Sequence, residues 1–315
     1  MPSVEENLNK WSSYSWNEQG NEWSKSWGGT DNCFWGSIYP RIQAFIPAGT
    51  ILEIAPGFGR WTQYLKDYCD NLIVVDLTEK CIAACQQRFA DCSHITYHVN
   101  DGKSLKMVPD KSIDFIFSFD SLVHAEEDVI QAYLQQIAFK LKPNGIGFIH
   151  HSNLGSYLNP STGKLEVEQL YWRAESMSAK LFEQYSEQAG LQCLSQEIIS
   201  WLGEDVMSDC ISVITPKISK WSRSNCVIEN IFFSEEAERL LINSCLYNLK
   251  HQTNNLTDSP IVQWQQFQWQ RQQTKTELES IKYQLQQTQL ELERSHATVN
   301  ELRELILKLD PEAKF

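Results

Sequence analysis

The chain has 315 residues and a formal net charge of −13 at pH 7, a length that accommodates one full domain with an appendage. This acidic balance argues against a nucleic-acid partner, because phosphate binding depends on clustered Lys and Arg. No stretch approaches the ~18 consecutive apolar residues of a membrane-spanning helix, and the N-terminus lacks the features of a secretory signal. Nine cysteines without a C-x-x-C pair fit reduced thiols. We therefore expect a cytoplasmic protein with no transmembrane segment.

Residues 1–40 are rich in tryptophan. Trp11, Trp16, Trp23, Trp27 and Trp35 lie among Ser, Asn and Gly, an aromatic density that a disordered tail would not need. We expect this segment to form a lid that packs on the following domain. Packing in the core explains the tryptophans about equally well.

Residues 41–217 alternate between short apolar runs and helical patterns. The apolar runs are 51–55, 71–77, 95–100, 112–119 and 145–151. Such alternation is typical of βαβ units and predicts a doubly wound, mostly parallel α/β sheet with helices on both faces. Two later runs, 191–201 and 210–216, predict an antiparallel terminal hairpin, which brings the sheet to seven strands.

Residues 218–260 are expected to be a helical connector, and residues 261–315 to form a long helix. The core positions of a seven-residue repeat in this helix are Trp264, Phe267, Arg271, Thr274, Leu278, Ile281, Leu285, Thr288, Leu292, Ser295, Val299, Leu302, Ile306 and Leu309. Ten of these fourteen positions are apolar, which indicates a left-handed coiled coil.

The charges beside this seam indicate how the helices pair. Glu277 would face Lys282 of a parallel partner chain, and Glu291 would face His296. We therefore expect a parallel homo-oligomer, a dimer or trimer, formed through residues 264–309. A single helix folded back on the domain is the alternative.

A glycine-containing turn follows the first predicted strand. It reads EIAPGFG over residues 53–59, and Asp76 ends the second predicted strand seventeen residues later. Backbone N–H groups of such a turn face a ligand across the strand ends, where a carboxylate can accept both hydroxyls of a ribose. A dinucleotide site would have a third glycine. Arg60 occupies that position here, with Trp61 beside it, which favours a different nucleotide cofactor.

The third predicted strand ends in Asn100-Asp101-Gly102, where a carboxylate can bind an adenine amino group. With these motifs, residues 45–215 resemble class I S-adenosylmethionine-dependent methyltransferases. The resemblance is closer to those of bacterial glycan and secondary-metabolite pathways, which have a similar FSFDSLVH after the fourth strand and HHSN after the fifth. It implies a Rossmann-like fold and S-adenosylmethionine as the cofactor.

The resemblance also implies a role for each residue of the cofactor site. Glu53 and the following loop would face the methionine part of the cofactor, Asp76 the ribose, and Leu77 and Asp101 the adenine. Phe119 and Asp120 would flank the sulfonium. The sequence departs from the family at Ala55, where a glycine is usual. The full set of predicted cofactor residues is Glu53, Ala55, Pro56, Gly57, Gly59, Arg60, Trp61, Asp76, Leu77, Asn100, Asp101, Gly102, Phe119 and Asp120.

Methyl transfer to a hydroxyl requires alignment of the acceptor and removal of its proton, for which histidine is suited. The candidates are His124, His150 and His151. Adjacent residues of a strand point to opposite faces, so His150 and His151 do not share one pocket unless the strand has ended. We expect His151, nearer the loop, to be the base, with His124 as the second candidate. Asp120, His151 and Glu197 as ligands of a divalent cation are the less favoured alternative to a site without metal.

The expected function is S-adenosylmethionine-dependent O-methylation of a sugar or glycan hydroxyl. A tryptophan-rich N-terminus and a C-terminal coiled coil also resemble features of methyltransferases that act on growing polysaccharides. One alternative is O-methylation of a small secondary metabolite or a peptide carboxylate. Another is a cofactor-binding scaffold that recruits a glycosyltransferase through the coiled coil.

Overall fold

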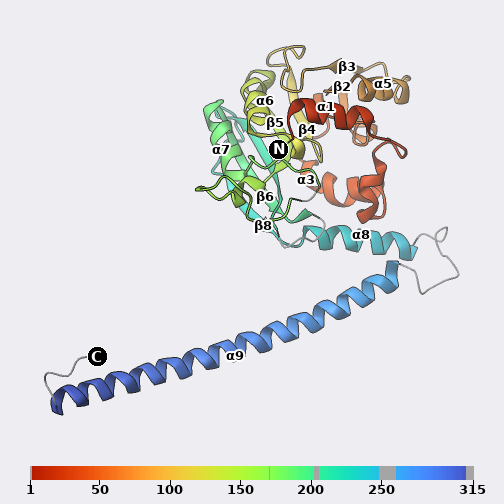
Figure 1. The fold of residues 1–315 in the computed structure, drawn as a ribbon. Coiled ribbons are helices and arrows are strands. Elements are labelled where there is room, and N and C mark those ends of the chain that lie inside the picture. Colours follow the sequence, from red (N-terminus) through yellow and green to blue (C-terminus); the bar gives the residue numbers. More distant parts are fainter. Residues whose placement is uncertain (1, 170, 202–205, 248–259, 310–315) are drawn as a thin grey trace. The chain divides into compact units, whose positions relative to one another are not determined.

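The structure, a computed structural model, describes residues 2–169, 171–201, 206–247 and 260–309, the last segment with only part of its side chains. The chain divides into two units, Met1–Tyr247 and Asn248–Phe315. The first unit contains the sheet and the candidate site. The second contains the long helix α9 (Pro260–Leu309) (Figure 1).

Within the described residues of the first unit, eight strands form one sheet in the order β3-β2-β1-β4-β5-β7-β6-β8. β7 runs antiparallel to β5 and β6, and the other neighbours are parallel. The strands are β1 (Ala48–Ile54), β2 (Cys69–Asp76), β3 (Ile95–Val99), β4 (Ile113–Ser118), β5 (Leu141–Ser152), β6 (Leu191–Ile199), β7 (Asp209–Pro216) and β8 (Cys226–Asn230). The sequence predicted seven strands, and β8 is the additional one. It pairs with β6 from a segment that was expected to be helical.

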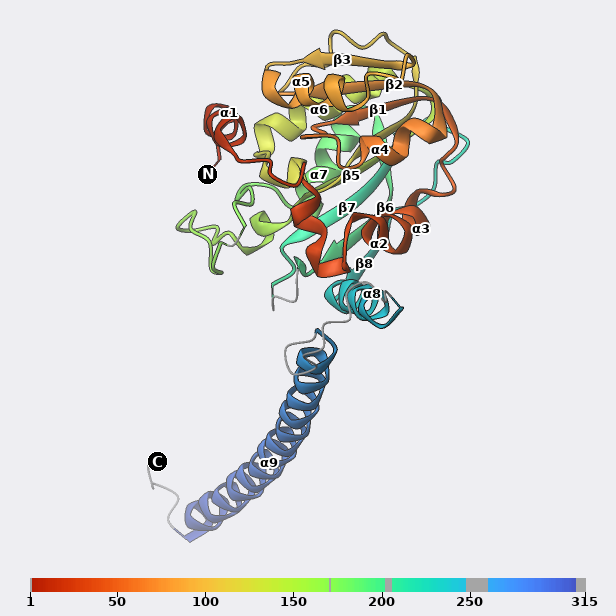
Figure 2. The same ribbon diagram turned by 90° about the vertical axis from the view of Figure 1, so that its right-hand side faces the viewer.

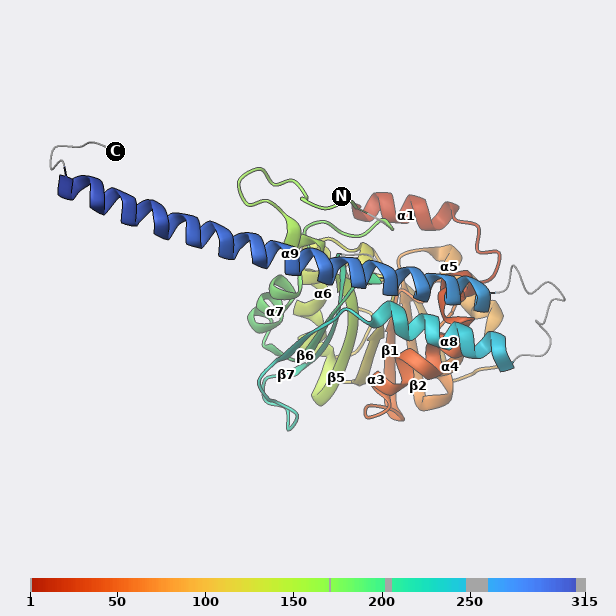
Figure 3. The same cartoon turned by 90° about the horizontal axis from the view of Figure 1, so that it is seen from below.

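Helices cover both faces of the sheet, because successive strand residues point to opposite sides. On β1, Ile51 belongs to the apolar core shared with α3, α4, α5 and α8, whereas Leu52 belongs to the core shared with α6 and α7 (Figure 3). The longer helices are α1 (Val4–Ser13), α5 (Glu79–Arg88), α6 (Glu127–Lys140), α7 (Ala179–Gln188) and α8 (Phe233–Tyr247). The shorter ones are η1 (Asn21–Trp27), α2 (Thr30–Asn32), η2 (Cys33–Ile38), α3 (Tyr39–Ile42), α4 (Thr62–Leu65), η3 (Lys66–Tyr68), η4 (Leu122–His124) and η5 (Leu154–Tyr157).

The N-terminal segment packs on the carboxyl ends of the parallel strands (Figure 2). A reciprocal pair of bonds between Ser3 and Glu6 caps the start of α1. After α1, the Trp16 ring stacks on Phe58 with centroids 4.8 Å apart. Lys80 of α5 donates to the carbonyl groups of Ser12, in the last turn of α1, and Tyr14, just after it. These contacts hold the segment against the glycine-containing turn.

The segment after β7 completes the first unit. Phe233 of α8 is 1% exposed and packs against Trp27 and Trp201. Arg41 of α3 forms ion pairs with Glu197 of β6 and Glu236 of α8. α8 therefore contributes to the core of the folded domain, and β8 extends the edge of its sheet beside β6.

In the second unit, α9 spans 50 residues, in agreement with the expected long helix. Among its seam residues with described side chains, the apolar ones are 45–59% exposed; these are Leu278, Ile281, Leu285, Leu292, Val299 and Leu302. No helix in the described part of the chain is both long and apolar enough to cross a membrane.

Candidate functional site

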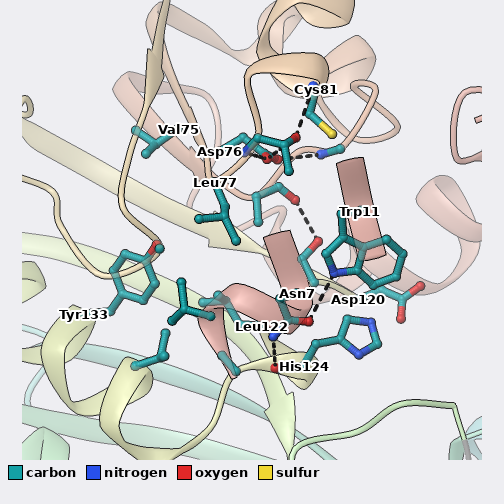
Figure 4. A pocket seen from close by; sticks show the side chains of 18 of the residues that line it. Asn7, Trp11, Val75, Asp76, Leu77, Cys81, Asp120, Leu122, His124 and Tyr133 are labelled. Carbon is teal, nitrogen blue, oxygen red and sulfur yellow. Dashed lines mark hydrogen bonds between the residues drawn. The ribbon is translucent and has the colours of Figure 1, made fainter. Parts of the chain in front are cut away.

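A pocket lies where the carboxyl ends of the parallel strands meet α1, and we call it the first pocket (Figure 4). Its strand side includes six of the residues predicted for the cofactor: Ala55, Gly57, Asp76, Leu77, Gly102 and Asp120. Its opposite wall is formed by Val4, Asn7, Trp11, Trp16 and Trp23. The N-terminal segment therefore covers the site at which the sequence predicts a nucleotide cofactor.

Asp76 presents a buried carboxylate to this pocket. Its side chain is 6% exposed, and its oxygens accept bonds from the Gly57 N–H (3.2 Å) and from the N–H (2.8 Å) and hydroxyl (3.0 Å) of Thr78. Burial raises the pKa of Asp76 to about 6, although these donors act in the opposite direction. Each carboxylate oxygen has two lone pairs; Oδ1 already accepts two of these bonds and Oδ2 one, so Oδ2 can still accept one hydroxyl donor from a ribose.

The turn after β1 brings the backbone close to the pocket. Gly57 has a φ of 59°, and a Cβ there would lie 2.7 Å from the Trp16 ring. Glycine is therefore needed both for the conformation and for the space. Ala55 also has a positive φ, of 58°, the conformation that glycine adopts most easily, which explains why a glycine is expected at this position.

Glu53 lies beneath the turn and outside the pocket lining. It is 1% exposed, and its Oε2 accepts a 2.6 Å bond from the Thr62 hydroxyl. Among the described residues, its buried Oε1 has no hydrogen-bond partner. Burial raises the pKa of Glu53 to about 8. At pH 7 this carboxyl therefore mostly holds its proton, and its position outside the pocket lining does not support the prediction that it faces the methionine part of the cofactor.

Other predicted cofactor residues also fall outside the pocket lining; these are Pro56, Gly59, Arg60, Trp61, Asn100, Asp101 and Phe119. Asn100 donates to the Tyr133 hydroxyl and supports the pocket from behind. Asp101 accepts from the backbone N–H groups of Lys103 and Ser104, so its carboxylate is engaged in a turn. The prediction that Asp101 contacts the adenine amine is not supported by this placement.

The sequence did not single out several residues that line the pocket. Val129 and Tyr133 come from the first half of α6, and Ala125 lies just before this helix. Their spacing of four residues places them on one face of a helix. This spacing is the sequence pattern that could have identified them. Val75, Thr78, Cys81 and Leu122 also line the pocket.

A second, larger pocket adjoins the first. The two share Trp11, Trp23, Asp120 and His124 in their walls. Aromatic side chains dominate the second pocket, namely Trp11, Tyr14, Trp23, Tyr171, Trp172 and Trp201. Its charged side chains are Lys10, Glu22, Asp120 and Arg173, two of each sign.

His124 lies at the junction of the two pockets. Its Nδ1 is 2.7 Å from the carbonyl oxygen of Trp172. Because a carbonyl only accepts, Nδ1 carries the hydrogen, and Nε2 of the neutral ring has a free lone pair. Burial, reinforced by the positive charge of Arg173, lowers the pKa of His124 to about 4, so the ring is neutral at pH 7. No described residue bonds to Nε2.

The structure places His151 away from both pockets. β5 continues to Ser152, so the strand has not ended at the two histidines. The His151 ring stacks on Phe182 and its nitrogens lie against Ser152 and Ser212. Burial lowers its pKa to about 3. This placement does not support the prediction of His151 as the base; His124 is the candidate that lines both pockets.

His150 points to the other face of the sheet and belongs to a buried charge network. Its Nδ1 accepts from the Asp120 N–H (3.0 Å), and its Nε2 is 3.2 Å from Asp209, without hydrogen-bond geometry. Burial opposes ionisation of Asp209, but Arg173 and His150 lower its pKa to about 2. Asp120 pairs with Arg60 at 2.7 Å. This network fixes Asp120, which has a φ of 58°.

The three residues considered as metal ligands each have other partners. Asp120 pairs with Arg60, Glu197 with Arg41, and His151 lies against Ser212. Among the described residues, no group of three or more His, Cys, Asp or Glu is arranged to hold a metal ion.

Comparisons with known proteins identify the kind of domain. Residues 51–145 match the family described as a methyltransferase domain. The chain is 27% identical over 150 residues to phosphoethanolamine N-methyltransferase 1 of Triticum aestivum. The matched region covers 46% of this chain and 30% of the wheat protein. It is 25% identical over 151 residues to nodulation protein S of Sinorhizobium fredii, and this match covers 42% of this chain and 67% of the relative. The chain thus spans less than a third of the length of the wheat protein.

One solved structure agrees with this fold. An S-adenosylmethionine-dependent methyltransferase from Leishmania major superposes with a TM-score of 0.51 at 12% identity, covering 67% of this chain and 82% of that one. The eight-stranded, mostly parallel sheet is consistent with a Rossmann-like methyltransferase fold. The matches support a class I methyltransferase domain and indicate S-adenosylmethionine as its cofactor. The buried carboxylate of Asp76 at the strand ends fits the ribose of this cofactor.

Proposed function

We propose that the protein methylates a hydroxyl group of a sugar or glycan, with S-adenosylmethionine as the methyl donor. The observation that carries this proposal is the junction of the two pockets at Asp120 and His124. A cofactor in the first pocket and an acceptor in the second would meet beside a neutral histidine with a free Nε2. That arrangement suits proton removal from a hydroxyl.

The residues of the first pocket would hold the cofactor in a defined orientation. Asp76 would accept a ribose hydroxyl, and Leu77 and Val4 would contact the adenine from opposite walls. When bound, S-adenosylmethionine supplies a methyl group on a positively charged sulfur. Trp16 and the N-terminal segment would exclude water from this group, which preserves the alignment that methyl transfer requires.

His124 would act on the acceptor. The hydroxyl oxygen would form a bond to the methyl carbon as the bond from that carbon to sulfur breaks, and the hydroxyl proton would pass to Nε2 of His124. The neutral thioether S-adenosylhomocysteine would remain as the second product. The bond from Nδ1 to the Trp172 carbonyl orients the ring and stabilises the imidazolium that results. Because the free ring has a pKa near 4, we expect it to return this proton to solvent readily after each turnover.

The second pocket supports a ring-shaped, uncharged acceptor. Its aromatic side chains suit the flat apolar face of a sugar ring. Its two positive and two negative side chains balance in charge, which suits an uncharged acceptor. The positive group of Arg173 is already bonded to Asp209 at 2.8 Å, so it is poorly available to bind a phosphate of the acceptor. This feature favours a sugar hydroxyl over the phosphorylated amine named for the wheat relative.

The proposal is tested with His124→Gln and a panel of oligosaccharides, scored by a product mass increase of one methyl group. We expect the turnover of the variant to be roughly 10²–10⁴-fold lower than that of the parent protein. Its affinity for S-adenosylmethionine, measured by calorimetry, should stay within about twofold of the parent value. His98→Gln on β3, which lines neither pocket, is the matched control. Normal turnover of His124→Gln would exclude this histidine as the base.

A further inference from the structure

The side chain of Asn7 connects three segments that are distant in the sequence. Its Nδ2 donates to the carbonyl oxygens of Pro2 (3.2 Å) and His124 (2.8 Å). Its Oδ1 accepts from the indole nitrogens of Trp11 (3.3 Å) and Trp172 (3.2 Å). Both hydrogens and both lone pairs of the amide are therefore used. Figure 4 shows two of these bonds, to Trp11 and to the His124 backbone.

Three of the residues close a ring of hydrogen bonds around the junction of the pockets. Asn7 donates to the His124 carbonyl, His124 donates from Nδ1 to the Trp172 carbonyl, and Trp172 donates from its indole to Asn7. Each member orients the next. The Trp172 carbonyl holds the hydrogen on Nδ1 of His124 and so leaves Nε2 free. Asn7 helps to fix the position of Trp172, so the tautomer of His124 depends on Asn7.

Asn7 also lies on the helix that covers the first pocket. From α1, Val4, Asn7 and Trp11 line the first pocket, whereas Lys10, Trp11 and Ser13 line the second. Lys10 lies 4.3 Å from the centroid of the Trp172 ring, a further link between α1 and the second pocket. Placement of α1 over the first pocket therefore builds a wall of the second pocket at the same time.

We propose that Asn7 is a positioning residue that couples closure of α1 over the cofactor to the orientation of His124 and Trp172. This inference rests on the proposed function for the role of His124. It predicts that the acceptor site is complete only when the cofactor site is covered. Asn7 acts through its neighbours and has no part in proton transfer itself.

The coupling is tested in the full chain with Asn7→Ala, and with Asn9→Ala as the control. Asn9 lies on the same helix and is exposed. The first readout is the tautomer of the His124 ring, observed by ¹⁵N NMR at pH 7.5 and assigned with His124→Gln. The second readout is the dissociation rate of S-adenosylhomocysteine, measured by stopped-flow fluorescence.

We expect Asn7→Ala to lose the single Nδ1–H tautomer and to release S-adenosylhomocysteine about tenfold faster, whereas Asn9→Ala matches the parent protein in both. Faster release with an unchanged tautomer would overturn the coupling, because Asn7 would then only hold α1. An unchanged tautomer and rate would overturn it as well. The tautomer is measured without any ligand, so failure of the parent protein to bind S-adenosylhomocysteine would refute the proposed function and leave the test of the hydrogen-bond ring valid.

Discussion

We expect the buried carboxylate of Asp76 to link cofactor binding to pH. Burial raises its pKa from 3.8 to about 6, so the group gains a proton as the pH falls through about 6. The protonated acid loses the charge that would strengthen its bond with a ribose hydroxyl. We therefore expect the affinity for S-adenosylmethionine to be constant above about pH 7 and to fall severalfold between pH 7 and pH 5, as measured by calorimetry.

Asp76→Asn is the control for this pH dependence. The variant has no titrating group at this position, so its affinity should be weaker than that of the parent at pH 7 and should lack the fall associated with the pKa near 6. An equal pH dependence in both proteins would assign the titration to another group and would argue against Asp76 as the ribose acceptor.

At the level of single residues, the sequence located the first pocket better than it chose among the histidines. The strand ends could be located from the apolar runs, so Asp76 and Gly57 were found. The choice between His124 and His151 depended on where β5 ends. Pairing of Ser152 with Asp209 of β7 extends β5 past both adjacent histidines, and no local pattern indicates this long-range pairing.

At the level of secondary-structure elements, α8 belongs to the folded domain, and this placement has a measurable consequence. Phe233 is 1% exposed, whereas its neighbour Phe232 is 56% exposed. Removal of a buried aromatic side chain costs about 3–5 kcal/mol. We expect Phe233→Ala to lower the melting temperature of the first unit by roughly 6–20 °C, as measured by calorimetry or circular dichroism.

Phe232→Ala is the matched control, since it removes the same group from an exposed position of the same helix start. Its effect should stay within about 0.5 kcal/mol. Equal losses in the two variants would mean that α8 does not pack on the core as described.

The sequence predicted the five parallel strands and the final hairpin but not β8. The first five runs are apolar over most of their length, as buried parallel strands are. β8 is an edge strand with four of its five residues exposed, so it lacks the alternation or apolar run by which a strand is recognised. Its assignment depends on pairing with β6, which only the folded chain shows.

At the scale of the whole molecule, α9 presents an apolar seam that the described side chains leave exposed. Its 50 residues correspond to a rod of about 75 Å. Leu285 and Leu292 occupy successive first positions of the seven-residue repeat and are 58% and 55% exposed. Exposure of such a repeat in water is unfavourable, and pairing with the same helix of another copy would cover it.

We therefore propose that residues 264–309 form a parallel coiled coil that joins two or three copies of the chain. Light scattering at tens of micromolar should give the mass of a dimer or trimer for the parent protein. Leu285→Asp with Leu292→Asp should give a monomer, because charged side chains at the seam oppose association. Gln286→Asp with Gln287→Asp adds the same charge outside the seam and should leave the oligomer intact. A monomeric parent protein would refute the coiled coil, and dissociation by both double variants would show that added charge, and not the seam, controls assembly.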